Sequence, residues 1–401
     1  MLPRKVTLSI VVSISASLGI AHGEELDLPR LLKNGSVRVE TAEGAPLLRH
    51  RDEEPFVPAS ILKLATTFCA LETFGHDYRF KTDFYRGDKH TLYIRGSGDP
   101  SLVSEELREI AGHLAPLAPH LERIVIDPSL FSPDIDIDGS SASLNPYDSK
   151  TAAFVGNFSS AALYRRKDGS VVSAERQTPL TPLAQEAGLK LRRGTSERIN
   201  LGHTWQVGTR YGGELLAAFL RESGVSGAMA ISVGPIPAEA KKIYEHTSSK
   251  DLSVISEELL KYSTNFTANQ LFLILGIQRF GAPATVERSQ EAMRECLEQR
   301  VGWRDFHVEE GSGLSRKNRV TAAQMTLLLK HFERYQDLLS VEDDFIAKTG
   351  SLRGVNSLAG YFDLTPQRQV RFAILINSDV EHLYKFKVAS AIRRYLKSTV
   401  N

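Results

Sequence analysis

The chain has 401 residues, of which 42% are hydrophobic and 24% are charged, and its formal net charge is +1. This length allows a large buried core and two or three domains. The near-neutral charge gives no electrostatic reason to expect nucleic acid or an anionic membrane surface as a partner. With two cysteines in total, the chain is not a disulfide-rich scaffold.

The N-terminus has the pattern of a secretory signal peptide. Arg4 and Lys5 precede an apolar run over residues 6–21, and Ala21 and Gly23 supply small residues at the −3 and −1 positions of a cut after Gly23. A membrane anchor is the alternative, but a 16-residue run with four serines is short for a span. We therefore expect a signal peptide over 1–23 and an exported, periplasmic or cell-envelope protein without a stable membrane anchor.

The first predicted elements of the mature chain are a strand pair and a helix. Alternating residues at 36–41 and 46–51 predict two strands joined near Gly44. A helix is expected from residue 60 to 74, and Gly75 ends it. Because this helix is apolar nearly all round, it is expected to be buried inside a domain.

Residues 80–250 have a different texture of short strands, turns and a few helices. Strands are expected at 92–95 and 124–126, and an amphipathic helix at 104–113. The stretch 132–145 is rich in Asp and Ser and predicts a loop.

The C-terminal part is expected to begin with three helices. A helix is expected at 253–262. Thr267 with Gln270, and Thr321 with Gln324, have the spacing of capping boxes that open two further helices.

The chain is expected to end with strands and one more helix. The strands are predicted at 345–352, 356–364 and 369–377, the last two forming a hairpin. The final helix, 380–397, has a polar face of mixed charge, which favours packing on the sheet over binding to a membrane.

The two cysteines, Cys69 and Cys296, lie in apolar segments with helical patterns. This favours two buried free thiols. A disulfide stays open as the alternative, because an exported protein can form one.

Ser60-Ile61-Leu62-Lys63 is the only Ser-x-x-Lys in the chain. On a helix, positions i and i+3 lie on one face, so the hydroxyl and the amine are neighbours. A desolvated lysine can lose its proton and act as the base for a serine nucleophile. Alone this spacing is usually an ordinary helix surface.

Two further motifs favour a catalytic role for Ser60 and Lys63 over an ordinary helix surface. Ser263-Thr264-Asn265 lies between two predicted helices, and Lys348-Thr349-Gly350 lies on a predicted strand. Each is weak alone, but the three motifs in this order and on these elements resemble the signature of penicillin-interacting serine enzymes.

The surrounding residues narrow the resemblance. Gly311-Ser312-Gly313-Leu314-Ser315-Arg316, Ser351-Leu352 after the Lys-Thr-Gly motif, and Gly98-Asp99-Pro100 resemble the D-alanyl-D-alanine carboxypeptidase/endopeptidase family, the class C low-molecular-mass penicillin-binding proteins of peptidase family S13. The stretch Ser141-Ala142-Ser143-Leu144-Asn145 lacks the glutamate of class A β-lactamases, and Ser263 stands where class C β-lactamases carry tyrosine.

The resemblance implies an α/β (α+β) fold of the β-lactamase/DD-peptidase-like transpeptidase type, with an antiparallel sheet flanked by helices. The 203 residues between Ser60 and Ser263 indicate an inserted domain. We expect a discontinuous catalytic domain over 24–85 and 250–401, and a mainly-β insert over 86–249.

The resemblance also implies catalytic roles. Ser60 would be the nucleophile, Lys63 its base and Ser263 a proton relay to the departing amine. Asn265 would hold the substrate amide, and the N–H groups of Ser60 and Ser351 would form an oxyanion hole.

Substrate binding is expected at Lys348, Thr349, Gly350 and Ser351, which would hold the terminal carboxylate. Asp148 is the candidate for binding the free amine of the stem-peptide diamino acid. An aspartate that caps a loop turn is an equal alternative.

The expected partners are peptidoglycan stem peptides and β-lactam antibiotics, with no nucleic acid, cofactor or metal. The implied activity is a serine D-Ala-D-Ala carboxypeptidase or endopeptidase. The alternatives are a non-catalytic relative that binds peptidoglycan and a β-lactamase or esterase on the same fold. Intact Ser60, Lys63 and Lys348 argue against a non-catalytic relative.

Overall fold

A computed structural model describes residues 26–88 and 90–400. The expected signal peptide, 1–23, lies outside the described residues. Within the described ranges, no helix combines the length and apolarity needed to cross a membrane.

The catalytic part is built on a six-stranded antiparallel sheet with the strand order β11-β12-β13-β14-β1-β2. The sequence located all of these strands except the two-residue β11. Their bounds are β1 Gly35–Thr41, β2 Pro46–His50, β11 Val341–Glu342, β12 Phe345–Leu352, β13 Val355–Thr365 and β14 Arg368–Ile376.

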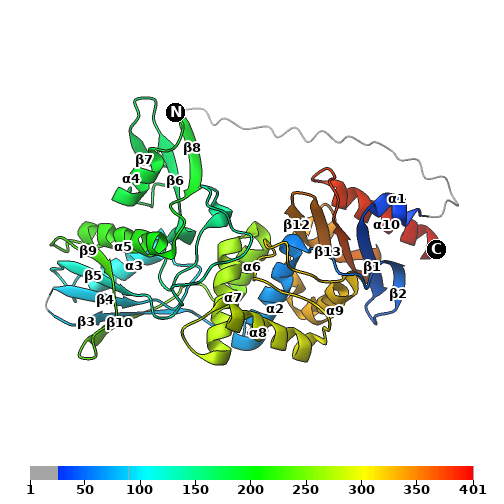
Figure 1. Ribbon diagram of the computed structural model, residues 1–401, viewed down its shortest axis with the longest axis horizontal. Helices are drawn as coiled ribbons and strands as arrows, with labels where there is room; N and C mark the ends of the chain where they lie inside the picture. The colour runs from blue at the N-terminus through cyan, green and yellow to red at the C-terminus, as the bar shows by residue number, and fades with distance from the viewer. Residues whose placement is uncertain (1–25, 89, 401) are drawn as a thin grey trace.

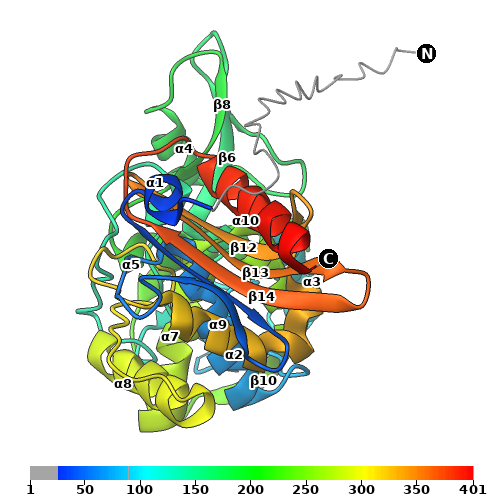
Figure 2. The ribbon, with the colours of Figure 1, turned by 90° about the vertical axis from the view of Figure 1, so that its right-hand side faces the viewer.

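Helices cover both faces of this sheet (Figures 1 and 2). α10 and α1 lie on the outer face, whereas α2 and α9 lie on the inner face, with α6, α7 and α8 behind them toward the insert. Their bounds are α1 Leu28–Leu32, α2 Lys63–Phe74, α6 Leu252–Tyr262, α7 Asn265–Phe280, α8 Val286–Cys296, α9 Ala322–Phe332 and α10 Tyr384–Val400.

Side-chain alternation along β13 explains this layering. Successive residues of a strand point to opposite faces. Ala359 and Tyr361 accordingly join the core around α2, and Leu358 and Phe362 join the core beneath α10. The sheet therefore has two buried faces, and only its edges and strand ends are open to a substrate.

The insert holds a five-stranded sheet of order β10-β3-β4-β5-β9 and a three-stranded sheet of order β7-β6-β8. Helices α3 and α5 share the core of the larger sheet. The bounds are β3 Lys81–Arg86, β4 Thr91–Arg95, β5 Arg123–Asp127, β6 Ser160–Arg165, β7 Val171–Ser173, β8 Thr195–Asn200, β9 Ala230–Val233, β10 Lys241–Thr247, α3 Ser104–Leu114, α4 Pro182–Gly188 and α5 Trp205–Glu222.

Most elements of the insert are strands, as expected, but its helices are prominent. α5, with 18 residues, is the longest element of the insert, and β4, β5 and β9 are parallel to one another. Parallel neighbours need crossover connections, and α3 and α5 provide them. The short apolar strands were visible in the sequence, but their parallel pairing was not.

The sheet pairing also bears on the domain bounds. β3 pairs with β4 and β10, so it is part of the insert sheet although it begins at Lys81. We propose that the chain passes into the insert after Phe80 and returns between Thr247 and Leu252.

Cys69 and Cys296 form a disulfide with Cα atoms 6.0 Å apart. The preference for two free thiols is therefore wrong. Cys69 lies in α2 and Cys296 ends α8. The sequence predicted a helical pattern in both segments, but not the contact between them. The bridge ties the helix that follows Ser60 to a helix 227 residues away.

Candidate active site

Ser60 lies in a 3₁₀ turn, Ala59–Leu62, that runs directly into α2, whose first residue is Lys63. The Lys63 side chain is fully buried, with 0% exposure. Its Nζ lies 2.9 Å from Ser60 Oγ, 2.8 Å from Asn265 Oδ1 and 2.7 Å from the Ser312 carbonyl oxygen. The first two motifs of the sequence thus meet at one nitrogen.

These three neighbours suit a neutral amine. The Asn265 and Ser312 oxygens can only accept, so they take the two N–H bonds of an uncharged Lys63. The lone pair then remains for the Ser60 hydroxyl, which can donate. In this state Lys63 is arranged to receive the serine proton.

Electrostatics favours the same protonation state. Burial lowers the pKa of Lys63 well below the ordinary 10.5, and the positive charge of Lys348 lowers it further, while Glu310 opposes the shift. A lowered pKa favours the neutral form of a lysine, and that form can act as a general base.

Ser263 and Asn265 form the corner between α6 and α7. Ser263 has φ 57° in the left-handed region, which ends α6 and lets the chain turn before Asn265 begins α7. Within the described residues the Ser263 hydroxyl makes no hydrogen bond, so it is available to a substrate. The predicted capping box at Thr267 is wrong, because Thr267 lies inside α7.

Gln270, the other half of that predicted box, has a different role. Its Nε2 donates to the carbonyls of Gly98 and Ala152, each at 3.0 Å. Asn265 Nδ2 likewise donates to the Tyr147 carbonyl at 3.3 Å. Helix α7 therefore holds the insert against the catalytic centre. The second predicted box, Thr321 with Gln324, is confirmed.

The Lys-Thr-Gly motif lies on β12 beside the nucleophile. A Cβ placed on Gly350 would lie 3.0 Å from the Ser60 nitrogen and 2.9 Å from the Pro58 carbonyl oxygen. Only glycine lets the strand come this close to the turn. Ser357 on β13 fixes the same contact by donating to the Pro58 carbonyl at 2.5 Å.

Lys348 is 3% exposed, and its Nζ donates to the Thr349 carbonyl at 3.0 Å. Burial lowers its pKa from 10.5 to about 8; Glu342 opposes this shift and Lys385 adds to it. Below pH 8 Lys348 is thus a positive charge in a mostly desolvated place, where it can bind a carboxylate strongly.

Glu310, for which the sequence predicted no role, stabilises the loop that contacts Lys63. Its buried carboxylate accepts from Ser312 N at 2.8 Å and from Asn318 Nδ2 at 2.9 Å. These bonds hold the loop that presents the Ser312 carbonyl to Lys63. Gly313, with φ 83°, lets this loop pack on Ala59. The motif from Gly311 to Arg316 was visible in the sequence, but the contact of its Ser312 carbonyl with Lys63 was not.

Asp148 is placed differently from the expectation. It is 1% exposed, and its carboxylate accepts from Ser141 N at 2.8 Å, Ser141 Oγ at 2.7 Å and Ser143 Oγ at 2.5 Å. An ammonium group would have to displace these bonds to reach it. The contacts favour the alternative of an aspartate that organises its own loop.

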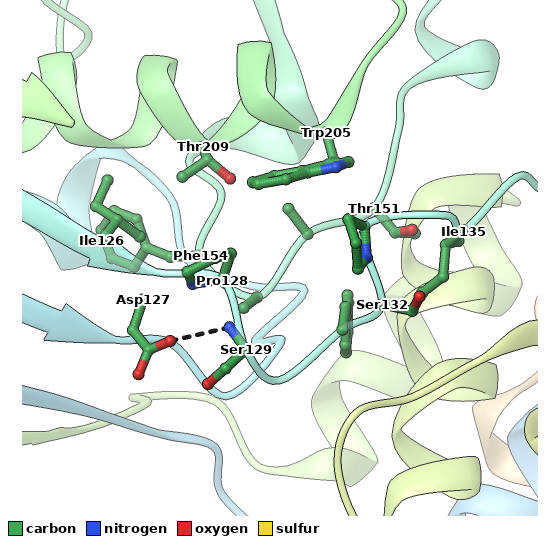
Figure 3. A pocket seen from close by; sticks show the side chains of 14 residues that line it. Ile126, Asp127, Pro128, Ser129, Ser132, Ile135, Thr151, Phe154, Trp205 and Thr209 are labelled. Carbon is green, nitrogen blue, oxygen red and sulfur yellow. Dashed lines mark hydrogen bonds between the residues drawn. The ribbon is translucent and has the colours of Figure 1, made fainter. Parts of the chain in front are cut away.

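A small cavity of about 120 Å³ lies in the insert, where β5 ends and α5 begins (Figure 3). Phe154 and Trp205 are among its mostly apolar lining residues, and Asp127 at its edge accepts from Ser129 N at 2.9 Å. None of the motif residues lines this cavity. It is separate from the catalytic centre.

The fold and this centre together fit a serine acyl-transfer enzyme, with a buried lysine amine beside the serine hydroxyl. The comparisons give the family. Residues 24–182, 192–345 and 333–398 match the model of the D-Ala-D-Ala carboxypeptidase 3 (S13) family. The chain belongs to this family, as its motifs indicate.

Individual relatives agree. A D-alanyl-D-alanine carboxypeptidase from Actinomadura sp. is 25% identical over 86% of this chain and 77% of its own length. The crystal structure of penicillin binding protein 4 from Haemophilus influenzae has a TM-score of 0.75 at 18% identity, covering 92% of this chain and all of that one.

A predatory endopeptidase from Bdellovibrio bacteriovorus, solved in complex with an immunity protein, has a TM-score of 0.53 at 18% identity and covers 91% of this chain and 92% of that one. At this level of identity both structural matches show the fold alone.

Proposed function

We propose that this protein is a serine DD-peptidase of peptidoglycan that is acylated on Ser60 by stem peptides ending in D-Ala-D-Ala. The observation that carries the proposal is the contact of the buried Lys63 amine with Ser60, Asn265 and the Ser312 carbonyl. A desolvated lysine beside a half-exposed serine is the arrangement that activates a hydroxyl at neutral pH.

Acylation then proceeds through two proton transfers and one bond exchange. Ser60 Oγ gives its proton to Lys63 Nζ and attacks the carbonyl carbon of the penultimate D-alanine. The N–H groups of Ser60 and Ser351 stabilise the oxyanion, each by about 3 kcal/mol. When the C–N bond breaks, the leaving amine takes the proton from Lys63 by way of Ser263.

Deacylation restores the enzyme. A water molecule gives its proton to Lys63 and attacks the ester carbon, and the Ser60 oxygen leaves and regains a proton. Asn265 orients the peptide amide throughout. Lys348, Thr349 and Ser351 of β12 bind the carboxylate beside the scissile bond, and Gly350 keeps the strand close to Ser60.

The same site reacts with penicillin, because a β-lactam presents an acyl carbon and a carboxylate in a similar relation. Substrate and inhibitor are both found outside the cytoplasm. We therefore propose an exported, periplasmic or cell-envelope enzyme whose partners are peptidoglycan stem peptides and β-lactams.

A fluorescent penicillin tests the nucleophile. Wild type is expected to form a long-lived covalent adduct, Ser60→Ala none, and the control Ser196→Ala, at an exposed serine of the insert, as much as wild type. Equal labelling of wild type and Ser60→Ala, or no labelling of either, would contradict the assignment. Rapid turnover of penicillin without an adduct would favour the β-lactamase alternative.

Purified muropeptides separate the two DD activities. Loss of one alanine from pentapeptides indicates a carboxypeptidase, and conversion of cross-linked dimers to monomers indicates an endopeptidase. Lack of both products in the presence of a penicillin adduct would favour a non-catalytic binding protein.

A further inference from the structure

Lys385 on α10 is a buried lysine that the mechanism above does not use. It is 1% exposed, although α10 otherwise lies on the outer face of the sheet (Figure 2). Its Nζ donates to the Gly350 carbonyl at 3.0 Å and to Ser351 Oγ at 2.6 Å. A residue near the C-terminus therefore reaches the strand that carries the Lys-Thr-Gly motif.

No ion pair neutralises Lys385 within the described residues, although Glu342 lies close enough to raise the pKa of both Lys385 and Lys348. Within residues 26–88 and 90–400, Lys385 and Lys348 hydrogen-bond only to neutral oxygens and pair with no carboxylate. Removing an ammonium group from water costs several kcal/mol, and buried charges are normally paired. Two such lysines behind one strand form a positive pocket that an anion would complete.

The direction of the hydrogen bond adds orientation to this charge. An ammonium group has no lone pair, so it can only donate, and Ser351 Oγ must be the acceptor. The hydroxyl proton of Ser351 then points away from Lys385. Ser351 is half-buried near the end of β12, so a ligand at this strand end can accept that proton.

We propose that Lys385 is a positioning residue for the substrate carboxylate: it turns the Ser351 hydroxyl proton toward that carboxylate and places a second positive charge behind it. This inference rests on the proposed function. Lys385 does not touch the reacting atoms. It makes the enzyme selective for substrates with a free carboxylate next to the scissile bond.

The simplest competing role is structural, because Lys385 also fastens α10 to β12. The two roles predict different kinetics. A fastening role changes the turnover of every substrate by a similar factor. A positioning role changes the ratio between a substrate with the carboxylate and one without it.

Two acyl-D-alanyl thioesters provide this ratio, one with a thioglycolate leaving group and one with thioglycolamide. For Lys385→Met we expect the carboxylate-to-amide ratio of kcat/KM to fall about 30-fold, mainly through KM, while kcat/KM for the amide falls about threefold. Lys385→Arg should restore part of the ratio. The matched control is Lys387→Met, an exposed lysine on the same helix that pairs with Glu381, and it should keep the wild-type ratio.

A double-variant cycle tests the route through Ser351. In the Ser351→Ala background, Lys385→Met should lower the ratio by about tenfold rather than 30-fold, because the effect of its charge remains while the hydroxyl that it orients is gone. If Lys385→Met does not fold, Lys385→Gln keeps an N–H donor without the charge, and its ratio should fall about tenfold.

Distinct outcomes overturn the two proposals. Equal losses on both thioesters, an unchanged ratio, or a full ratio loss in the Ser351→Ala background would overturn the role of Lys385. Failure of wild type to cleave either thioester or to form a penicillin adduct would instead overturn the proposed function.

Discussion

The surroundings of β12 and the insert differ in the ionisable groups that they bury. Behind β12, Lys63, Lys348 and Lys385 are buried with only neutral partners. In the insert, the buried Glu106 accepts from His246 Nε2 at 2.5 Å and from Ser249 N at 3.2 Å, and Asp148 accepts three hydrogen bonds.

The pKa shifts follow this difference. Burial lowers the pKa of Lys348 and Lys385 to about 8, and the nearby carboxylate of Glu342 offsets only part of this shift. Burial also opposes the ionisation of Glu106, but hydrogen bonds from His246 and Ser249 bring its pKa below the ordinary 4.5. Among the described residues, the two buried lysines of the site lack an ion pair, whereas the buried Glu106 of the insert has one with His246.

The insert still contributes to catalysis, through its position. Phe158 meets Phe266 edge to face at 6.2 Å, and Asn265 donates to the Tyr147 carbonyl. Polar groups whose hydrogen bonds are all made form a rigid surface. The insert can therefore hold Asn265 beside Lys63 without taking part in the reaction.

The largest effect is expected from removing the amine of Lys63, the proposed base. Lys63→Met should lower the rate of penicillin acylation at pH 7 by about 1,000-fold. The free energy of unfolding should change by less than about 1 kcal/mol, because relief of amine desolvation offsets two unsatisfied acceptors. Stopped-flow acylation and urea titration measure the two quantities. Lys190→Met, at an exposed lysine, is the control; rapid acylation by Lys63→Met would remove the lysine from the mechanism.

The opposite result is expected in the insert. Asp148→Ala leaves the Ser141 N–H and two serine hydroxyls without their acceptor, so it should lower the free energy of unfolding by about 2 kcal/mol. Turnover of a stem peptide with a free diamino-acid amine and of an acetylated D-Ala-D-Ala peptide should fall by the same factor.

Asp136→Ala serves as the control for that experiment, because Asp136 is 87% exposed and its ion pair with Lys150 contributes little. A selective loss on the stem peptide would show that Asp148 binds the amine after all. The two regions would then differ less than their hydrogen bonds suggest.

The smallest effect is a pH dependence. Lys348 and Lys385 have a pKa lowered to about 8, so they are charged below this pH and lose their charge as the pH rises through it. For a substrate with a free carboxylate, kcat/KM should fall about tenfold from pH 8 to pH 9. The corresponding amide should lack this alkaline limb in a parallel pH profile. A limb of equal size for both would assign it to another group.

The sequence by itself determined the local parts of this protein. Ser60 and Lys63 are one helical turn apart, Gly75 ends their helix, and the last two strands form the predicted hairpin. Such features depend on neighbours within a few residues, so spacing and residue type are enough to predict them.

Tertiary structure decided whatever joins distant segments. The disulfide of Cys69 with Cys296, the Ser312 carbonyl on Lys63 and the reach of Lys385 to Ser351 each need two elements to pack in one particular way. For Asp148 the sequence likewise left two roles open, binding a substrate amine and capping its own loop. The hydrogen bonds of the folded loop favour the second. Periodicity specifies which face of an element is buried, but not which distant side chain meets it there.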